Sequence, residues 1–358
     1  SFAGHSITTG NNNTAFGKSA LQNTTTSSSN TAIGQSALLL NTTGTQNVAV
    51  GSNALDANTT ANSNVAVGHR TLTANTTGAQ NTAIGSQVLA ANTTATNNTG
   101  VGNECLQNNT TGANITALGA FSLRANTSGN QNVAVGTNAI ISNTTGTRNV
   151  GLGFESLSHV TTGSYNVGLG SYAGNAITTG TENVCIGDNV DVDSAGRNNS
   201  ITIGAGLTSI GENYFTFGKS GNRVYNEFTS NASWTRSSDV RLKKDIQTNT
   251  DLGLNFINDL RTVTYKWKAP SELDSALPAY NADKTEADYT NKMYGFIAQE
   301  VKQALDDNNV SDFAGWTEDN EGVQGISYEM FVMPLVKAVQ ELSAENTALK
   351  ARLDAAGI

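Results

Sequence analysis

Ser238 and Lys243 are the two residues of this chain whose types and spacing suggest covalent chemistry. A lysine amine can take the proton of a serine hydroxyl and make it a nucleophile, provided that burial or a neighbouring cation favours the neutral amine. Arg241 and Lys244 supply such cations here. An activated serine hydroxyl can attack a carbonyl carbon and give an ester that water then hydrolyses. A serine and a lysine five residues apart also occur by chance, so the residues alone favour a solvated lysine and a turn serine.

A change of composition occurs at the same place. Residues 1–237 carry 8 Lys and Arg and 9 Asp and Glu, whereas residues 238–358 carry 12 and 20, so most of the net charge of -9 lies in the second part. No basic patch could follow nucleic-acid phosphates, which excludes nucleic acid as an expected partner. No apolar run reaches the roughly 18 residues of a membrane span, so no membrane insertion is expected.

Other residue types that carry chemistry are scattered. Cys105 and Cys185 occupy unrelated positions and read as small buried apolar residues rather than a disulfide. The three histidines have no ligand spacing, so neither a metal nor a cofactor is expected. Before residue 182 the chain has only three carboxylates, at unlike positions, which argues against a paired-carboxylate glycan-cleaving site. These three are Asp56, Glu104 and Glu155.

The first 204 residues are a strict repeat. They form the element that precedes and positions the segment with Ser238 and Lys243. Glycine recurs every 17 residues, twelve times, without an insertion or deletion. An apolar residue precedes each glycine, a small residue stands two before it, and Asn stands four before it in ten of the twelve repeats. Leu or Ile stands four after the glycine in the first nine. The glycines are residues 17, 34, 51, 68, 85, 102, 119, 136, 153, 170, 187 and 204.

Such constant length predicts a β-solenoid, because an insertion would break the stacking of the coils. Asn-Val-Ala-Val-Gly alternates like a short strand, so Val48 and Val50 share one face and Ala49 faces the other way. We expect the residue before each glycine, such as Val50, Val67 or Val135, to be buried in the coil. The small residues Ala49, Ala66 and Ala134 are then expected to face another subunit. Stacked Asn side chains should form hydrogen-bonded ladders.

The repeat resembles the left-handed β-roll heads of trimeric adhesins, whose Asn-x-Val-Ala-Ile-Gly coils are shorter. It is more similar to the Asn-Thr-Ala-Ile-Gly repeats of phage tail-fibre proteins. The resemblance implies a trimeric extracellular fibre and does not identify a receptor.

Residues 205–237 depart from the 17-residue rule and gather aromatic residues. This segment is expected to form a β-rich trimeric tip. Tyr214, Tyr225 and Trp234 are candidate contacts for a host glycan or protein receptor. The alternative, which the composition favours, is an aromatic core between chains.

The remaining residues, 238–358, predict an α+β domain. The apolar pattern predicts a helix over 251–260, a strand over 262–268, a strand leading into a helix from 294 to about 306, and a short strand over 322–328. Residues 269–291 read as a loop. A long helix follows from 327 to 356, and residues 329–356 predict a coiled coil with Asn346 as a polar residue in its seam. The seam residues are Val332, Leu335, Val339, Leu342, Asn346, Leu349, Leu353 and Ala356.

Three ordered motifs in this part carry a specific resemblance. They are Ser-Asp-Val-Arg-Leu-Lys at 238–243, Tyr-Gly-Phe-Ile-Ala-Gln-Glu-Val at 294–301, and Tyr-Glu-Met-Phe with Leu-Val-Lys-Ala-Val-Gln-Glu-Leu within 328–342. Together they resemble the endosialidase-type intramolecular chaperone of phage tail spikes and fibres, a self-cleaving domain. The resemblance implies a homotrimer-assembling domain that cuts itself off, with Ser238 as nucleophile and Lys243 as its lysine.

The sequence therefore predicts a mainly β protein of three parts: a solenoid shaft at 1–204, a tip at 205–237, and a chaperone and autoprotease domain at 238–358. We expect a phage tail-fibre or spike protein, made in the host cytoplasm and located in the virion, that cleaves itself once between Ser237 and Ser238. Other tail proteins are expected to bind a part that precedes Ser1. A cellular trimeric adhesin head and a fibre fragment of a glycan depolymerase, with its catalytic domain upstream, remain alternatives.

Overall fold

The computed structural model describes residues 2–228, 235–236, 238–275, 277, 280–287, 290–319 and 322–357. The chain divides into two compact units, Ser1–Lys243 and Lys244–Ile358. Each is described by itself below.

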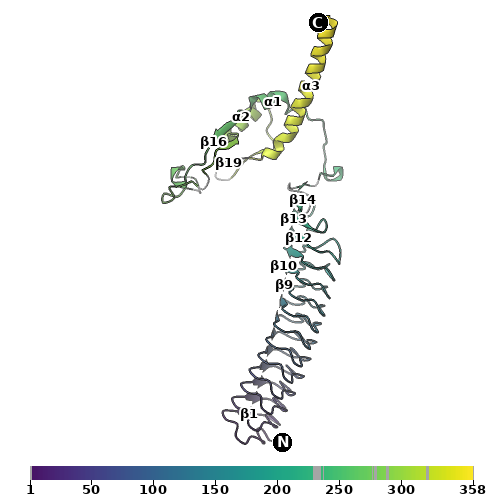
Figure 1. The fold of residues 1–358 in the computed structure, drawn as a ribbon, viewed down its shortest axis with the longest axis vertical. Coiled ribbons are helices and arrows are strands. Elements are labelled where there is room, and N and C mark those ends of the chain that lie inside the picture. Colours follow the sequence, from purple (N-terminus) through teal and green to yellow (C-terminus); the bar gives the residue numbers. More distant parts are fainter. Residues whose placement is uncertain are drawn as a thin grey trace. The chain divides into compact units, whose positions relative to one another are not determined.

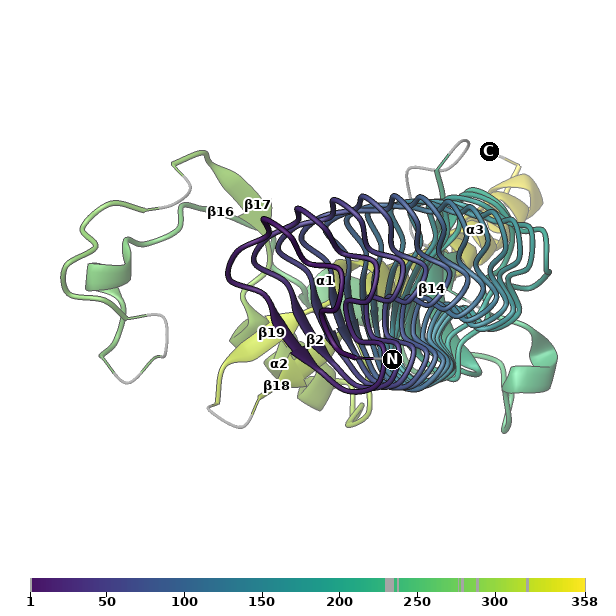
Figure 2. The same ribbon diagram turned by 90° about the horizontal axis from the view of Figure 1, so that it is seen from below.

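The first unit is a β-solenoid, in which each 17-residue repeat forms one coil with one short strand (Figures 1 and 2). Every strand pairs in parallel with the next at the equivalent residue, as Val48 does with Val65. The predicted solenoid is therefore confirmed. Its strands are β1 Thr14–Phe16, β2 Thr31–Ile33, β3 Val48–Val50, β4 Val65–Val67, β5 Thr82–Ile84, β6 Thr99–Val101, β7 Thr116–Leu118, β8 Val133–Val135, β9 Val150–Leu152, β10 Val167–Leu169, β11 Val184–Ile186 and β12 Ile201–Ala205.

The inward and outward faces of these strands are the reverse of the sequence-based prediction. Ala49, Ala66 and Ala134 are fully buried inside their own coils. The residues before the glycines lie on the outer face, where Val67 is partly exposed and Ile84 is 40% exposed. The prediction that the small residues face another subunit is therefore wrong, as is the burial of Val50, Val67 and Val135 within the coil.

The physical reason is the narrow interior of a 17-residue coil. In the first nine coils the leucine or isoleucine four residues after the glycine, such as Leu55 or Leu72, is fully buried and occupies this interior. A strand side chain that points inward must then be small. At Gly100 even an added Cβ would lie 2.7 Å from Cγ1 of Val88, a residue that stands where most coils have a smaller side chain. Small residues on the strand thus fit the coil's own core.

Two ladders of buried asparagines run along the solenoid, as predicted. In the ladder that precedes the strands, the backbone N–H of Asn64 donates to Oδ1 of Asn47 at 3.0 Å. In the ladder of the turns, Nδ2 of Asn58 donates to Oδ1 of Asn41 at 2.9 Å. All four side chains are fully buried. Since a buried amide without partners is costly, these ladders stabilise only coils that stack in register.

The glycine that follows each solenoid strand lies at a corner of the coil and adopts a positive φ. Gly51 has φ 137°, and a Cβ at this position would lie 2.2 Å from the carbonyl oxygen of Gly68 in the next coil. Glycine is thus required by both backbone conformation and close stacking. The buried leucines also have positive φ, 50° for Leu55, a left-handed conformation that the sequence pattern does not indicate.

The sheet changes direction after the twelfth coil. β13 (Tyr214–Lys219) still pairs in parallel with β12, but Phe215 lies opposite Ile201, a step of 14 residues instead of 17. β14 (Asn222–Glu227) then folds back antiparallel on β13 through a two-residue turn, Ser220-Gly221, with φ 81° at Gly221. β15 (Thr235–Arg236) pairs antiparallel with β14. In its described residues, the segment after the solenoid thus forms a β-hairpin and a further short strand that extend the solenoid sheet.

The second unit is a small α+β fold that ends in a long helix. Its helices are α1 Leu254–Asp259, α2 Ala298–Asp307 and α3 Val332–Ala355, with 3-10 turns η2 Pro270–Glu272 and η3 Tyr328–Phe331. β16 (Val263–Tyr265) pairs antiparallel with β17 (Met293–Gly295), and β18 (Trp316–Glu318) with β19 (Gln324–Ile326). These elements agree with the sequence-based expectations, except that β18 was not predicted.

Aromatic side chains form the core of this unit. Phe256 of α1 is fully buried and stacks on Phe331 of η3, with ring centroids 6.1 Å apart. α1 packs against α3, and the carboxylate of Glu341 accepts a hydrogen bond of 2.7 Å from the backbone N–H of Leu254. This hydrogen bond lowers the pKa of Glu341. The predicted seam residues of α3, including Leu335 and Leu349, are exposed in the single chain, and the coiled coil remains a prediction.

Candidate functional site

Ser238 and Lys243 lie together in the structure. Nζ of Lys243 donates a hydrogen bond of 2.7 Å to Oγ of Ser238. This distance suits proton transfer between an amine and a hydroxyl. Both side chains are exposed in the single chain.

A short turn brings the lysine back to the serine. The residues between them form the 3-10 helix η1 (Val240–Leu242), and Asp239 is its N-cap. The Asp239 carboxylate accepts hydrogen bonds from the backbone N–H of Arg241 at 2.9 Å and from its guanidinium at 2.7 and 3.0 Å. At the other end, the N–H of Lys243 donates to the carbonyl of Val240 at 3.1 Å. The turn thus returns the chain over five residues.

The Asp239 carboxylate is ionised at neutral pH. Its pKa is lowered chiefly by the side-chain hydrogen bonds from Arg241. Sequence analysis placed Asp239 within the 238–243 motif but assigned it no role. The signal that could have identified it is the preference for Asp at an N-cap, three residues before the end of a short helical turn.

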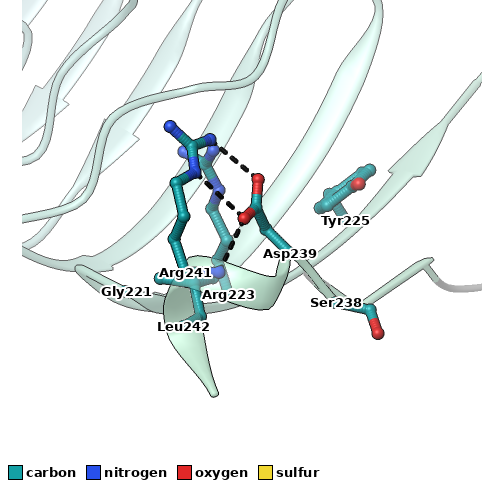
Figure 3. A pocket seen from close by; sticks show the side chains of 7 residues that line it. All are labelled: Gly221, Arg223, Tyr225, Ser238, Asp239, Arg241 and Leu242. Atoms are coloured by element: carbon teal, nitrogen blue, oxygen red, sulfur yellow. Dashed lines mark hydrogen bonds and ion pairs between the residues drawn. The ribbon is translucent and has the colours of Figure 1, made fainter. Parts of the chain in front are cut away.

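A cavity of about 780 Å³ lies beside this turn. Gly221, Arg223 and Tyr225 of the terminal hairpin line it together with residues 238, 239, 241 and 242. In Figure 3, Asp239 faces the guanidinium of Arg241, whereas the hydroxyl of Ser238 points away from this pair. Ser238 and the terminal hairpin therefore border the same space, and Arg223 is a neighbour that the sequence did not indicate.

Two of the three candidate receptor contacts lie side by side. Tyr214 of β13 and Tyr225 of β14 are partly exposed, and their ring centroids are 6.0 Å apart at an angle of 60°. Trp234 lies outside the described residues, as does Ser237, the residue before the candidate cleavage point.

Other candidate chemical groups do not add to the site. Cys105 and Cys185 are buried and unpaired. Burial raises the pKa of Cys105 to about 11 and that of Cys185 to about 12, so neither is a thiolate at neutral pH. The described residues contain no group of three or more His, Cys, Asp or Glu side chains that could hold a metal ion. Among them, no helix is both long and apolar enough to span a membrane.

Comparison with known proteins finds a matching family for the segment that begins at Ser238. Residues 238–309 match the model of a peptidase family described as the chaperone of endosialidase. These residues are therefore similar to that family, and we call residues 238–309 the endosialidase-type chaperone region. No curated protein and no solved structure matches the chain. The match begins at the candidate nucleophile and includes the turn η1, the elements α1, β16 and β17, and all of α2.

This finding confirms the family resemblance that the sequence motifs indicate. A β-solenoid of twelve 17-residue coils precedes the endosialidase-type chaperone region. Together the two parts indicate a protein of the phage tail-fibre kind, and the family indicates self-cleaving peptidase activity.

Proposed function

We propose that this protein is a homotrimeric phage tail-fibre or spike protein for host attachment, and that its C-terminal domain first assembles the trimer and then releases itself between Ser237 and Ser238. The observation that carries the release is the 2.7 Å hydrogen bond between Nζ of Lys243 and Oγ of Ser238, at the first residue of the endosialidase-type chaperone region.

The proposed reaction uses only groups of the chain and one water molecule. Neutral Lys243 accepts the proton of the Ser238 hydroxyl while Oγ forms a bond to the carbonyl carbon of Ser237. The amide bond between the two residues breaks, and its nitrogen takes up a proton to become the amino group of Ser238. Water then hydrolyses the ester, giving the Ser237 carboxylate and restoring the Ser238 hydroxyl. Since nucleophile and carbonyl are neighbours in the chain, positioning replaces much of the machinery of a general protease.

An amine acts as a base only where its neutral form is favoured, through burial or neighbouring cations. Ser238 and Lys243 are both exposed in the single chain. The proposal therefore requires that the other copies cover the pair in the trimer, with Arg241 of the three chains close by. Cleavage would then follow assembly.

The proposed host attachment uses the end of the solenoid sheet. Release of residues 238–358 removes Ser238, Asp239, Arg241 and Leu242 from the cavity beside Tyr225. The hairpin of β13 and β14 would then form the terminus of the fibre and offer Tyr214 and Tyr225 to a glycan or protein receptor. Aromatic rings with a polar tip suit both kinds of receptor.

Substitutions at the pair test the cleavage. Wild-type chain should yield two fragments, of which the smaller is residues 238–358 by mass spectrometry and N-terminal sequencing. Ser238→Ala and Lys243→Ala should leave a full-length folded trimer, because assembly needs packing but not the hydroxyl or the amine. Lys244→Ala is the matched control and should be cut normally. A wild-type trimer that stays whole after long incubation would contradict self-cleavage, and cleavage that stops only in Ser237→Ala would move the nucleophile by one residue.

A further inference from the structure

The outer face of the solenoid strands is an uncharged stripe. We call it the outer strand face and define it as the first and third residues of β1 to β12. The third residue is apolar in all twelve strands, and the first is Val, Ile or Thr. These side chains are partly exposed, as with Val65 and Val67, or exposed, as with Ile84 and Leu152.

The stripe is comparable in area to the largest apolar patch of a typical monomer, which is often functional. Twelve strands at the usual spacing of parallel strands give a length of about 53 Å, and a width of two side chains gives an area on the order of 500 Å². Apolar patches beyond a few hundred Å² usually mark interaction sites. Charged residues are confined to the segments before and after the strands, as with Arg148 and Glu182 before, and Arg70 and Glu155 after. An apolar centre with a polar rim is the anatomy of a protein interface.

The spacing of the stripe limits its partner. Because equivalent residues pair from strand to strand, both rows continue along the solenoid with one residue of each row per coil. A partner that packs against every coil needs the same spacing along its own length. Another copy of this solenoid, parallel and in register, has this spacing by construction. Parallel alignment also brings the C-terminal units of the copies to the same end.

We propose that the outer strand faces of the three copies pack against one another along the fibre axis and form the subunit interface of the shaft. This inference rests on the proposed homotrimer and deepens it by placing the contact on the outer strand face. It also explains why the third residue of every strand stays apolar although the coil does not bury it.

Cysteine cross-linking in the full-length chain tests this placement. Val67→Cys puts a thiol on the outer strand face, and Thr60→Cys puts one on the exposed turn between β3 and β4. Cys105 and Cys185 are fully buried, and the unsubstituted chain controls for them. With a short bis-maleimide, Val67→Cys should give covalent dimers and trimers on a denaturing gel, at least ten-fold more than Thr60→Cys. Sedimentation of the same samples gives their mass.

Cross-linking and sedimentation together test the position of the interface separately from the existence of the trimer. A mass of three chains with equal or no cross-linking at the two positions would place the interface elsewhere and overturn the inference, while the trimer would stand. A mass of one chain would overturn both, and the stripe would then belong to a different partner. Cross-links at Val67→Cys in a sample of trimer mass support the placement.

The variants Val67→Asp and Thr60→Asp test the same interface without a cross-linking reagent. Val67 is partly exposed in the folded coil, so Val67→Asp should leave the far-UV circular dichroism of the chain unchanged. In the trimer it would bury three unpaired carboxylates at one level of the shaft, and the fraction of trimer should fall at least ten-fold. Thr60→Asp should assemble like wild type. Equal trimer fractions for the two variants would contradict the proposed interface.

Discussion

At the scale of single residues, the candidate site depends on how Lys243 returns to Ser238. A lysine five residues from a serine reaches it only if the intervening chain turns, and η1 is that turn. Asp239 holds η1 by accepting hydrogen bonds from the backbone and the guanidinium of Arg241. Asp239 therefore acts as a positioning residue for the proposed pair and not as a participant in the chemistry.

We expect Asp239→Ala to slow self-cleavage by about five-fold, the effect of a lost helix cap. Asp239→Asn keeps an oxygen that caps the turn and should retain most of the rate, although the ion pair with Arg241 is lost. The measurement is the time course of the fragment 238–358 on a denaturing gel, with the trimer mass followed in parallel. Equal rates for the Ala variant and wild type would show that the turn does not position the lysine. A loss of trimer in both variants would assign Asp239 to assembly instead.

At the scale of the secondary-structure elements, the size of a strand side chain determines whether it lies inside or outside its coil. The interior accepts one large side chain per coil, the leucine after the glycine, and the strand meets it with a small residue. Branched residues are left to the outer face. The asparagine ladders then lock the stacking, because each buried amide finds partners only in the neighbouring coil or within its own turn.

Ala66→Leu tests this arrangement directly. Ala66 is fully buried inside its coil, so the added methylene groups must displace the coil's own core. We expect a loss of about 1–3 kcal/mol in the free energy of unfolding, measured by urea with far-UV circular dichroism. Thr60→Leu lies on an exposed turn and should change this free energy by no more than about 0.5 kcal/mol. If Ala66 instead faced another subunit, Ala66→Leu would weaken association and leave the unfolding of the coil unchanged.

At the scale of the whole molecule, a nearly uncharged solenoid is joined to an acidic α+β unit. Within one chain, each solenoid strand contacts only the neighbouring strands. An interface between three chains forms only after the chains have been aligned with one another. A C-terminal unit that trimerises would hold the chains together and raise their effective concentration. The exposed apolar row of α3 is suited to this role, because three such helices could bury it. Removal of the unit after assembly would leave a fibre whose stability is kinetic. It would be set by the rate of unfolding rather than by the equilibrium free energy of unfolding.

The proposed attachment is tested on the released fibre. We expect fibre 1–237 to bind host cells or an immobilised glycan library, and Tyr225→Ala to reduce this binding at least ten-fold. Tyr172→Ala is the matched control, since Tyr172 is an exposed aromatic residue on a solenoid coil, packed edge-on against Phe154. Equal loss in both variants would place the receptor contact on the shaft, and no loss in either would remove the tyrosine pair from the receptor site. The uncleaved Ser238→Ala protein should bind more weakly than the released fibre.

The strict 17-residue repeat was sufficient to predict the solenoid, its coil length, the corner glycines and the asparagine ladders. Repeats of constant length form a regular structure only by stacking coil on coil. The three motifs of the C-terminal part determined the chaperone resemblance, and the residue types at 238 and 243 determined the candidate pair. Alternation along the strands also showed that Val48 and Val50 share a face.

Only the tertiary structure decided which face of the strand is inside. Alternation defines two faces but not their direction, and the usual rule that larger apolar residues are buried gave the wrong answer here. The leucine of the next corner fills the narrow coil, so Ala49 turns inward and Val50 outward. The structure likewise decided that Lys243 meets Ser238, because a separation of five residues fixes no distance until Asp239 closes the turn between them.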